Sequence, residues 1–225
     1  MMSNSSAIAG SLVFLSAVAL VLAALVLRRY GVERRLCYLY WGLGLFLFFV
    51  TLVEEAVLDF GVWSQPLIQS YLVLVAVLVG ILSMGSAELS LARRWRWPYF
   101  GYLGLTSVAL IVVGFTTTIP NSIISNGVVS GLPPASIDLI SSLITFPAAV
   151  LLIVSALYGA VKYRRYHLLY IAIGTGVISA AGTLYLVSFP ATLYYAEFIG
   201  ILLLFLGFVR IPRLTVQSSP QPHTA

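Results

Sequence analysis

Long apolar runs separated by short polar segments make up most of the chain. Seven runs can be traced, and each is close to the roughly 20 residues that an α-helix needs to cross a hydrocarbon core about 30 Å thick. None shows the alternation of apolar and polar positions that is typical of a membrane-spanning strand, so the pattern predicts helices. We expect an all-α polytopic membrane protein with transmembrane helices at about 7–27, 36–58, 66–91, 98–119, 136–160, 166–187 and 191–209.

The segments outside these runs carry the polar and turn-forming residues. The longest, from Ile119 to Ser136, is rich in Pro, Gly, Asn and Ser, which predicts irregular structure. Residues 1–6 carry no charge, so the first run lacks the basic start of a cleaved signal peptide and is expected to remain as a helix. Residues 1–225 are therefore expected to form a single integral membrane domain, with 210–225 as a mobile cytoplasmic tail.

Composition excludes a soluble globular protein. Hydrophobic residues make up 60% of the chain and charged residues only 8%, which is far from the balance of a water-soluble domain. The single cysteine, Cys37, excludes an intrachain disulfide and a cysteine-based metal cage. The net charge of +5 is spread over short clusters between apolar runs, so it does not indicate nucleic-acid binding.

The positions of the basic residues predict the orientation. All twelve Lys and Arg residues follow the first, third, fifth and seventh predicted helices, which places them on one side of the bilayer. The positive-inside rule makes that side cytoplasmic. We therefore expect a multi-pass protein of the cell membrane with its N-terminus outside and its C-terminus inside.

The second half of the chain partly repeats the first. At an offset of 130 residues an arginine pair, a leucine, a tyrosine and a glycine coincide: Arg34, Arg35, Leu39, Tyr40 and Gly44 match Arg164, Arg165, Leu169, Tyr170 and Gly174. This match predicts a 3+1+3 layout, in which the fourth helix joins two parallel triplets. The alternative is that any two helices that start after arginines at an aromatic-rich interface look alike.

The 3+1+3 layout resembles that of the SWEET sugar transporters and the related PQ-loop proteins, and more distantly that of the microbial opsins. The resemblance implies a transporter fold with a substrate site between the triplets, near mid-membrane. The chain departs from the PQ-loop pattern, because Pro147 is followed by Ala148 rather than by glutamine. It also lacks the Schiff-base lysine of the opsins, since its one lysine, Lys162, lies at the end of the fifth predicted helix. We therefore expect no retinal.

A looser similarity covers the second and third predicted helices. The segment CYLYWGLGLFLFFVTLVEEAV, which begins at Cys37, and the later run SMGSAELS are similar to a group of uncharacterised prokaryotic seven-helix membrane proteins. That similarity implies a membrane fold and no particular activity.

Three acidic residues in the outer halves of predicted helices are candidates for function. Glu54, Glu55 and Glu197 have no Lys or Arg in that half of the membrane, and an ionisable group within a span is costly unless it lines a cavity or has a partner. Carboxylates without a counter-ion favour a shared proton or a bound cation. The pattern therefore predicts a proton or cation pathway near the outer surface, and Thr51, four residues before Glu55, lies on the same helical face.

The alternative interpretation places the acids at an interface. Glu54 and Glu55 are near enough to their helix end to reach lipid headgroups, and Asp59 and Asp138 are near enough to the ends of theirs to face water. Glu88, at the inner end of the third predicted helix, is expected to pair with a cytoplasmic arginine.

Pro147 interrupts the hydrogen-bond ladder of the fifth predicted helix and leaves the carbonyl of Leu143 without its usual donor. Such a kink can line a binding cavity, so Pro147 joins the pathway candidates. The alternative is an ordinary membrane-helix proline whose freed carbonyl is satisfied by a neighbour. In the sixth predicted helix, Gly174, Gly176 and Ala180 are small residues that permit close helix packing.

No catalytic motif is evident in the sequence, so we expect no enzyme, no cofactor and no metal site. The leading hypothesis is a small-solute or proton/cation-coupled transporter, or a ligand-binding seven-helix protein. The alternatives are a non-catalytic structural or accessory subunit of a membrane complex and a membrane sensor without a soluble output domain. The expected partners are the lipid bilayer and either further copies of this chain or other membrane subunits. A polar cavity lined by Glu197 and by Glu54 or Glu55 would favour transport, whereas a solid apolar core would favour the subunit.

Overall fold

A computed structural model describes residues 2–120, 124–125, 128–129, 133–162, 164, 168–185, 198–204 and 206–207. The helices are α1 (Met2–Glu33), α2 (Leu36–Asp59), α3 (Gln65–Ser90), α4 (Arg93–Thr116), α5 (Ala135–Lys162) and α6 (Leu168–Tyr185). Residues 198–204 and 206–207 are also helical. Within the segment expected to be irregular, β1 (Ile124–Ser125) pairs with β2 (Val128–Val129) as a short antiparallel hairpin.

Five of the described helices, α1 to α5, are long and apolar enough to cross a membrane. The part of α6 from Leu168 to Val177 is apolar but shorter. The prediction of a predominantly helical chain with several helices apolar enough to cross a membrane is therefore confirmed in this coarse sense. Of the seventh predicted span, 191–209, the structure describes residues 198–204 and 206–207.

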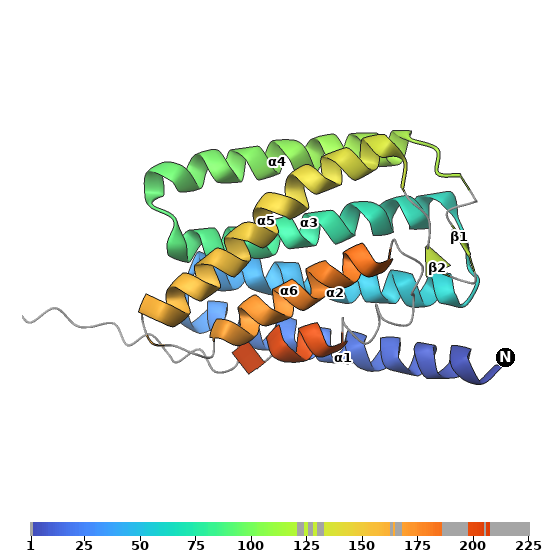
Figure 1. Ribbon diagram of the computed structural model, residues 1–225, viewed down its shortest axis with the longest axis horizontal. Coiled ribbons are helices and arrows are strands. Elements are labelled where there is room, and N and C mark those ends of the chain that lie inside the picture. The colour runs from blue at the N-terminus through green and yellow to red at the C-terminus, as the bar shows by residue number, and fades with distance from the viewer. Residues whose placement is uncertain are drawn as a thin grey trace, which may run out of the picture.

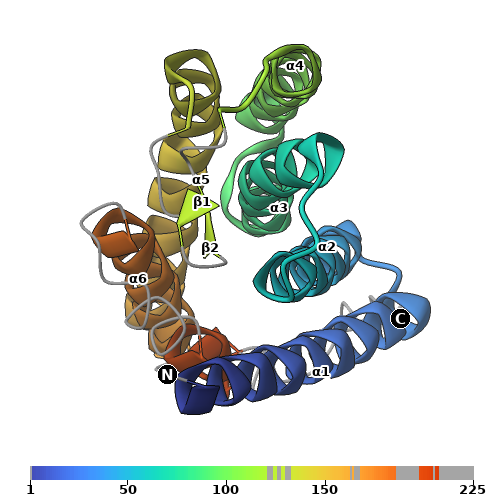
Figure 2. The ribbon, with the colours of Figure 1, turned by 90° about the vertical axis from the view of Figure 1, so that its right-hand side faces the viewer.

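The helices run side by side along one axis, and consecutive helices point in opposite directions (Figure 1). Viewed from one end, α1, α2, α3 and α4 follow one another in an arc, and α5 and α6 face its inner side (Figure 2). Helix α3 packs against α2 and α4, its neighbours in the arc, and also against α5 on the inner side of the arc. A polar side chain on α3 can therefore reach three different helices.

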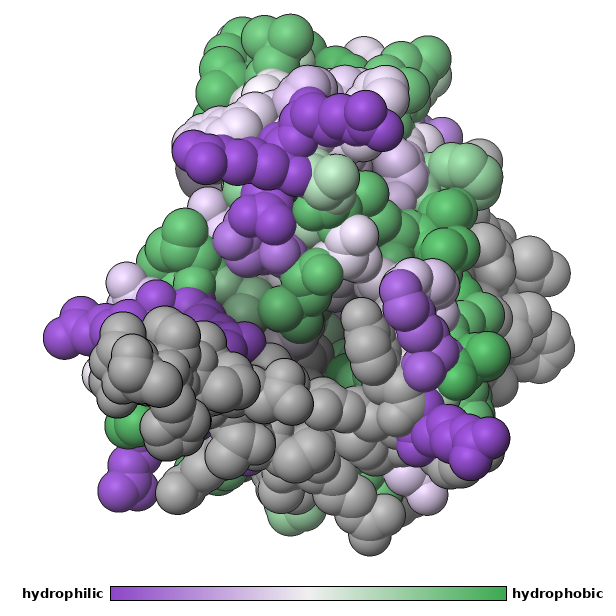
Figure 3. All heavy atoms as spheres, turned by 90° about the vertical axis from the view of Figure 1, so that its left-hand side faces the viewer, coloured by the Kyte–Doolittle hydropathy of each residue, from purple (hydrophilic) through white to green (hydrophobic). Residues whose placement is uncertain are grey.

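One end of the bundle carries basic residues. The α1–α2 turn, the α3–α4 turn and the end of α5 lie together at the left of Figure 1. Figure 3 faces this end, where strongly hydrophilic residues form separate patches between hydrophobic ones. The arginines of the α1–α2 and α3–α4 turns and Lys162 belong to it. This arrangement agrees with the prediction that the basic clusters after the first, third and fifth helices lie on one side of the bundle. The cytoplasmic orientation of that side stays a prediction.

Two helix boundaries differ from the predicted ones at this end. Helix α1 continues to Glu33, so Arg28 and Arg29 lie on the helix rather than in a loop. Helix α4 begins at Arg93 rather than at Pro98.

The early start of α4 has a cause in side-chain contacts. Arg96 Nη1 donates to Glu88 Oε1 at 2.6 Å, and Arg96 Nη2 donates to the carbonyls of Glu88 and Leu91 at 2.8 and 3.3 Å. The guanidinium thus satisfies carbonyls at the end of α3 and holds the first turn of α4 in place. The predicted pairing of Glu88 with an arginine is confirmed.

The turn after α1 ends in an unusual backbone conformation. Arg34 has φ +53°, and its N–H donates to the carbonyl of Tyr30 at 2.8 Å, which is the left-handed closure usually made by glycine. Arg164, which follows α5, has φ +52°. These two are the non-glycine residues with positive φ in the described chain, and they are the same positions that the 130-residue offset aligns.

The largest buried cluster joins the two halves of the chain. It contains Val26 of α1 and Trp41 of α2 together with Ala156 of α5 and Ile171 of α6. The pairs Val26 and Ala156, and Trp41 and Ile171, are again separated by 130 residues. Residues separated by the 130-residue offset therefore lie within one apolar core.

Candidate functional site

The candidate acids on α2 lie close to the turn that leads into α3. This turn is closed by Gly61, which has φ +79°; its N–H donates to the carbonyl of Leu58, and the N–H of Val62 donates to that of Val57. The two bonds form a Schellman motif, whose left-handed residue favours glycine. The motif sends α3 back antiparallel to α2, so residues equally far from the turn lie at the same depth.

Glu54 meets Ser70 at equal depth. Glu54 is five residues from the end of α2 and Ser70 is five residues from the start of α3, roughly 7–8 Å below the helix ends at 1.5 Å per residue. Ser70 Oγ donates to Glu54 Oε1 at 2.6 Å. The other oxygen, Oε2, is shielded from solvent and has no hydrogen-bond partner among the described residues. One oxygen of the carboxyl group is therefore held by Ser70, and the other is buried without a hydrogen-bond partner among the described residues.

Ser70 has a second acceptor within reach. Its Oγ lies 3.1 Å from the carbonyl oxygen of Leu67, one turn earlier in α3. A hydroxyl has a single proton, so it donates either to Glu54 or to Leu67. When the proton turns to Leu67, the lone pairs of Oγ can accept a hydrogen bond from a protonated Glu54. The pair can therefore form a hydrogen bond in both protonation states of the acid.

Two glutamines on the same part of α3 hold the end of α4. Buried Gln69 donates from Nε2 to the carbonyl of Thr117 at 2.9 Å and to that of Phe115 at 3.5 Å. With the nitrogen of its side-chain amide facing the carbonyl of Ile119, Gln65 donates to that carbonyl and accepts a hydrogen bond from the N–H of Ile119. These bonds satisfy backbone groups at the end of α4. They also fix the first turns of α3, on which Ser70 lies.

The other predicted pathway residues of α2 are buried. Glu55 is 7% exposed and Thr51 is 3% exposed, which agrees with one shared inward face. The Thr51 hydroxyl donates to the carbonyl of Phe48 at 2.8 Å, a bond within its own helix. Glu197 lies outside the described residues, as does the side chain of Asp59. The proposed meeting of Glu197 with Glu54 or Glu55 therefore stays a prediction.

Pro147 belongs to a different part of the molecule. The carbonyl of Leu143, which the proline leaves without a helix donor, accepts a hydrogen bond of 2.6 Å from the Tyr102 hydroxyl of α4. The carbonyl that the proline frees is thus hydrogen-bonded by a neighbouring helix, as the alternative interpretation expected. Pro147 also lines an apolar groove of about 620 Å³ between α4 and α5, on which neither Glu54 nor Glu55 lies.

Removing the Tyr102 hydroxyl should weaken the contact between α4 and α5. Tyr102→Phe is expected to lower the free energy of unfolding by about 1 kcal/mol, because the Leu143 carbonyl loses the hydrogen bond that the Tyr102 hydroxyl donates. In a Pro147→Ala background the same change should cost close to nothing, since alanine returns the backbone N–H that the helix needs. Unfolding midpoints of the four proteins in detergent micelles measure this coupling. An equal cost in both backgrounds would contradict the assigned role of the hydroxyl.

The small residues of α6 differ in their surroundings. A Cβ at Gly174 would lie 2.8 Å from the carbonyl oxygen of Gly200 and 3.1 Å from Leu203, so the backbone of residues 198–204 approaches α6 closely there. A Cβ at Gly176 would have nothing within 4 Å. Ala180 is helical, and its side chain lies outside the described set. Among these positions, the structure places close helix packing at Gly174.

Several residues that make these contacts were not identified from the sequence. Ser70 and Gln69 look like ordinary polar residues near a helix start, and Tyr102 looks like one aromatic residue among many. Counting equally from the two sides of the α2–α3 turn would have found Ser70 as the partner of Glu54. No comparable signal identifies Tyr102, because its contact depends on how α4 and α5 are rotated.

Comparison with family models, with curated proteins and with solved structures finds no match for this chain, so the resemblance to SWEET, PQ-loop and opsin proteins stays a prediction.

Proposed function

We propose that this protein is a multi-pass transporter of the cell membrane that moves protons or small cations, alone or coupled to a small solute. Glu54 is the residue that binds the proton or cation near the outer surface. The observation that carries the proposal is the Glu54 carboxyl group, held by Ser70 on one oxygen and left without a partner among the described residues on the other. The protein has no enzymatic role in this proposal.

The chemistry of the pair supports reversible binding. A buried carboxylate with an unpartnered oxygen is costly in a medium of low dielectric constant, and a bound proton or cation removes that cost. Release has a low structural cost as well, because Ser70 exchanges one acceptor for the other by rotating its hydroxyl. A transporter needs a site that binds and releases with similar ease.

The repeated features of the two halves support a transporter layout. In the proposed arrangement α1–α3 and the helices from α5 onward are parallel triplets joined by α4, with seven spans and the N-terminus outside. The paired left-handed arginines, Arg34 and Arg164, and the shared core around Trp41 and Ile171 favour a common origin of the triplets. Transporters with parallel repeats move their substrates along the interface of the repeats.

The proposal is tested with purified protein in vesicles that contain a pH-sensitive dye. A potassium gradient with valinomycin drives protons inward, and wild-type vesicles are expected to acidify faster than protein-free vesicles. Ser70→Ala should slow this flux about tenfold, because it removes a hydrogen bond to a charged group. Ser70→Thr retains the hydroxyl and should keep most of the flux.

Failure of the wild type to exceed protein-free vesicles, with protons and then with sodium or potassium as the driven ion, would contradict transport. The accessory-subunit hypothesis would then be preferred. In that case Glu54 and Ser70 would serve only to hold α2 against α3.

A further inference from the structure

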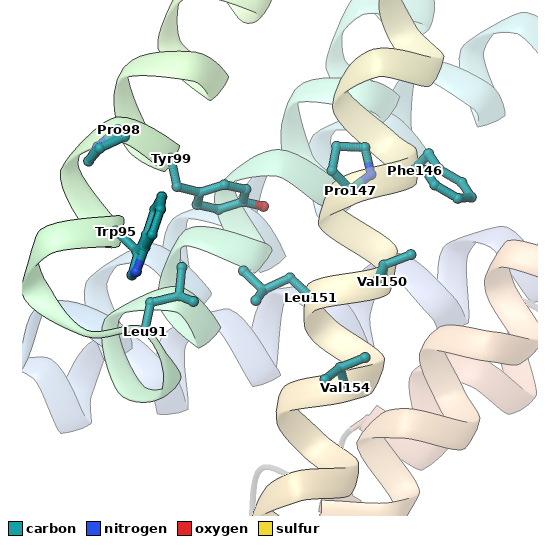
Figure 4. A pocket seen from close by; sticks show the side chains of 9 residues that line it. All are labelled: Leu91, Trp95, Pro98, Tyr99, Phe146, Pro147, Val150, Leu151 and Val154. Atoms are coloured by element: carbon teal, nitrogen blue, oxygen red, sulfur yellow. The ribbon is translucent and has the colours of Figure 1, made fainter.

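The apolar groove between α4 and α5 opens on the outside of the bundle. Figure 4 shows Trp95 and Tyr99 on one side, and Pro147 and Leu151 on the facing helix. Phe146 and Trp95 are 74% and 61% exposed, so large apolar surfaces at its edges have no cover within the described chain. In a bilayer the natural contents of such a groove are apolar chains.

Its walls are held rigidly. The Tyr99 hydroxyl lies 2.7 Å from Ser83 Oγ of α3, which is fully buried, so the ring is fixed against the bundle. The bond from Tyr102 to the Leu143 carbonyl joins α4 to α5 at the deeper end of the groove. A groove shaped by fixed side chains loses little entropy when a ligand enters it.

The groove runs from the basic end of the bundle toward its middle. Leu91 and Trp95 lie at the α3–α4 turn, whereas Phe146 and Pro147 lie midway along α5. From Val154 to Phe146 alone it follows α5 for roughly 12 Å at 1.5 Å per residue. In the proposed membrane orientation the groove extends from the lipid headgroups into the hydrocarbon core.

Two cations lie at the headgroup end. Arg93 and Arg94 are exposed, and the guanidinium carbon of Arg94 lies 6.0 Å from the ring centre of Trp95, which lines the groove. Glu88 is engaged with Arg96, and within the described residues no carboxylate forms an ion pair with Arg93 or Arg94. Arg94 thus lies beside Trp95 at the end of the groove, and Arg93 is the residue before it in the first turn of α4.

We propose that this groove binds an anionic phospholipid, with an acyl chain between α4 and α5 and the headgroup phosphate on Arg93 and Arg94. Arginine presents several donors to phosphate oxygens, and basic residues near the membrane surface select anionic lipids. A zwitterionic lipid would bring its own cation close to the two guanidinium groups. The site is independent of Glu54, which lies toward the opposite end of the bundle.

The test is native mass spectrometry of the protein in detergent, titrated with phosphatidylglycerol or with phosphatidylcholine. The wild type is expected to bind the first phosphatidylglycerol about thirtyfold more tightly than the first phosphatidylcholine, the size expected for two arginines near an anionic lipid. The double variant Arg93→Gln/Arg94→Gln should lose this preference. The control, Arg28→Gln/Arg34→Gln, removes two exposed charges from the same end and should keep it.

A second variant tests the groove itself. Val154→Trp places a large ring in the groove at a position that is already 55% exposed, so folding should be unaffected. It should abolish tight binding of phosphatidylglycerol, whereas Val161→Trp, on an exposed part of α5 that does not line the groove, should not. Equal binding of the two lipids by the wild type would overturn the proposal. So would loss of preference in the arginine double variant combined with normal binding by Val154→Trp, because the lipid would then lie on the arginines outside the groove.

Discussion

Glu54→Gln is expected to reduce proton or cation flux into vesicles to the level of protein-free vesicles. Glutamine has nearly the same size as glutamate and can still accept the hydrogen bond from Ser70, so the contact between α2 and α3 should persist. The amide cannot bind and release a proton, and it has no charge to hold a cation. The variant therefore removes the proposed chemistry while leaving the local packing in place.

Stability distinguishes this loss from misfolding. The unfolding midpoint of Glu54→Gln should equal or exceed that of the wild type, because a neutral amide is less costly to bury than a carboxyl group with an unpartnered oxygen. Asp138→Asn is the matched control, since Asp138 is an exposed acid in the first turn of α5 at the same end of the bundle. Its flux should stay at the wild-type rate. Full flux through Glu54→Gln would remove Glu54 from the mechanism.

Gly85→Ala is expected to destabilise the bundle more than any other single methyl addition to α3 or α4. A Cβ at Gly85 would lie 2.4 Å from Trp41 Cδ1 and 3.0 Å from the backbone carbonyl oxygen of Cys37. Trp41 is 5% exposed within the largest core cluster, so its ring cannot swing away. The backbones of α2 and α3 would have to separate, which we expect to cost about 3 kcal/mol, the upper part of the usual range for overpacking.

Gly101→Ala provides the comparison for this change. Gly101 lies in the interior of α4, and a Cβ there would have nothing within 4 Å. The unfolding midpoint of the Gly101→Ala variant should match that of the wild type or rise slightly, because alanine favours the helix. Unfolding of the variants in detergent micelles gives the difference. Similar midpoints for Gly85→Ala and Gly101→Ala would show that α2 and α3 do not approach as closely as described.

Several local features could be predicted because they depend on short stretches of chain. The first five predicted spans coincide with α1 to α5 to within a few residues, apart from α1, which extends beyond its predicted span at both ends, and the early start of α4. The pairing of Glu88 was predictable, since arginines follow it within one turn of the helix end. The unsatisfied carbonyl of Leu143 was predictable from Pro147 alone, although its donor, Tyr102, was not.

The amino-acid sequence by itself determined which segments are apolar helices and at which end the basic residues gather. Each of these depends on the cost of placing a given residue in oil or water, a property that is local and adds along the chain. Only the tertiary structure decided that Glu54 meets Ser70, that Pro147 lines an apolar groove that includes neither Glu54 nor Glu55, and that Trp41 packs against Gly85. Those contacts depend on the rotation of each helix about its own axis. That rotation is set by side-chain packing between helices far apart in sequence, which no local pattern contains.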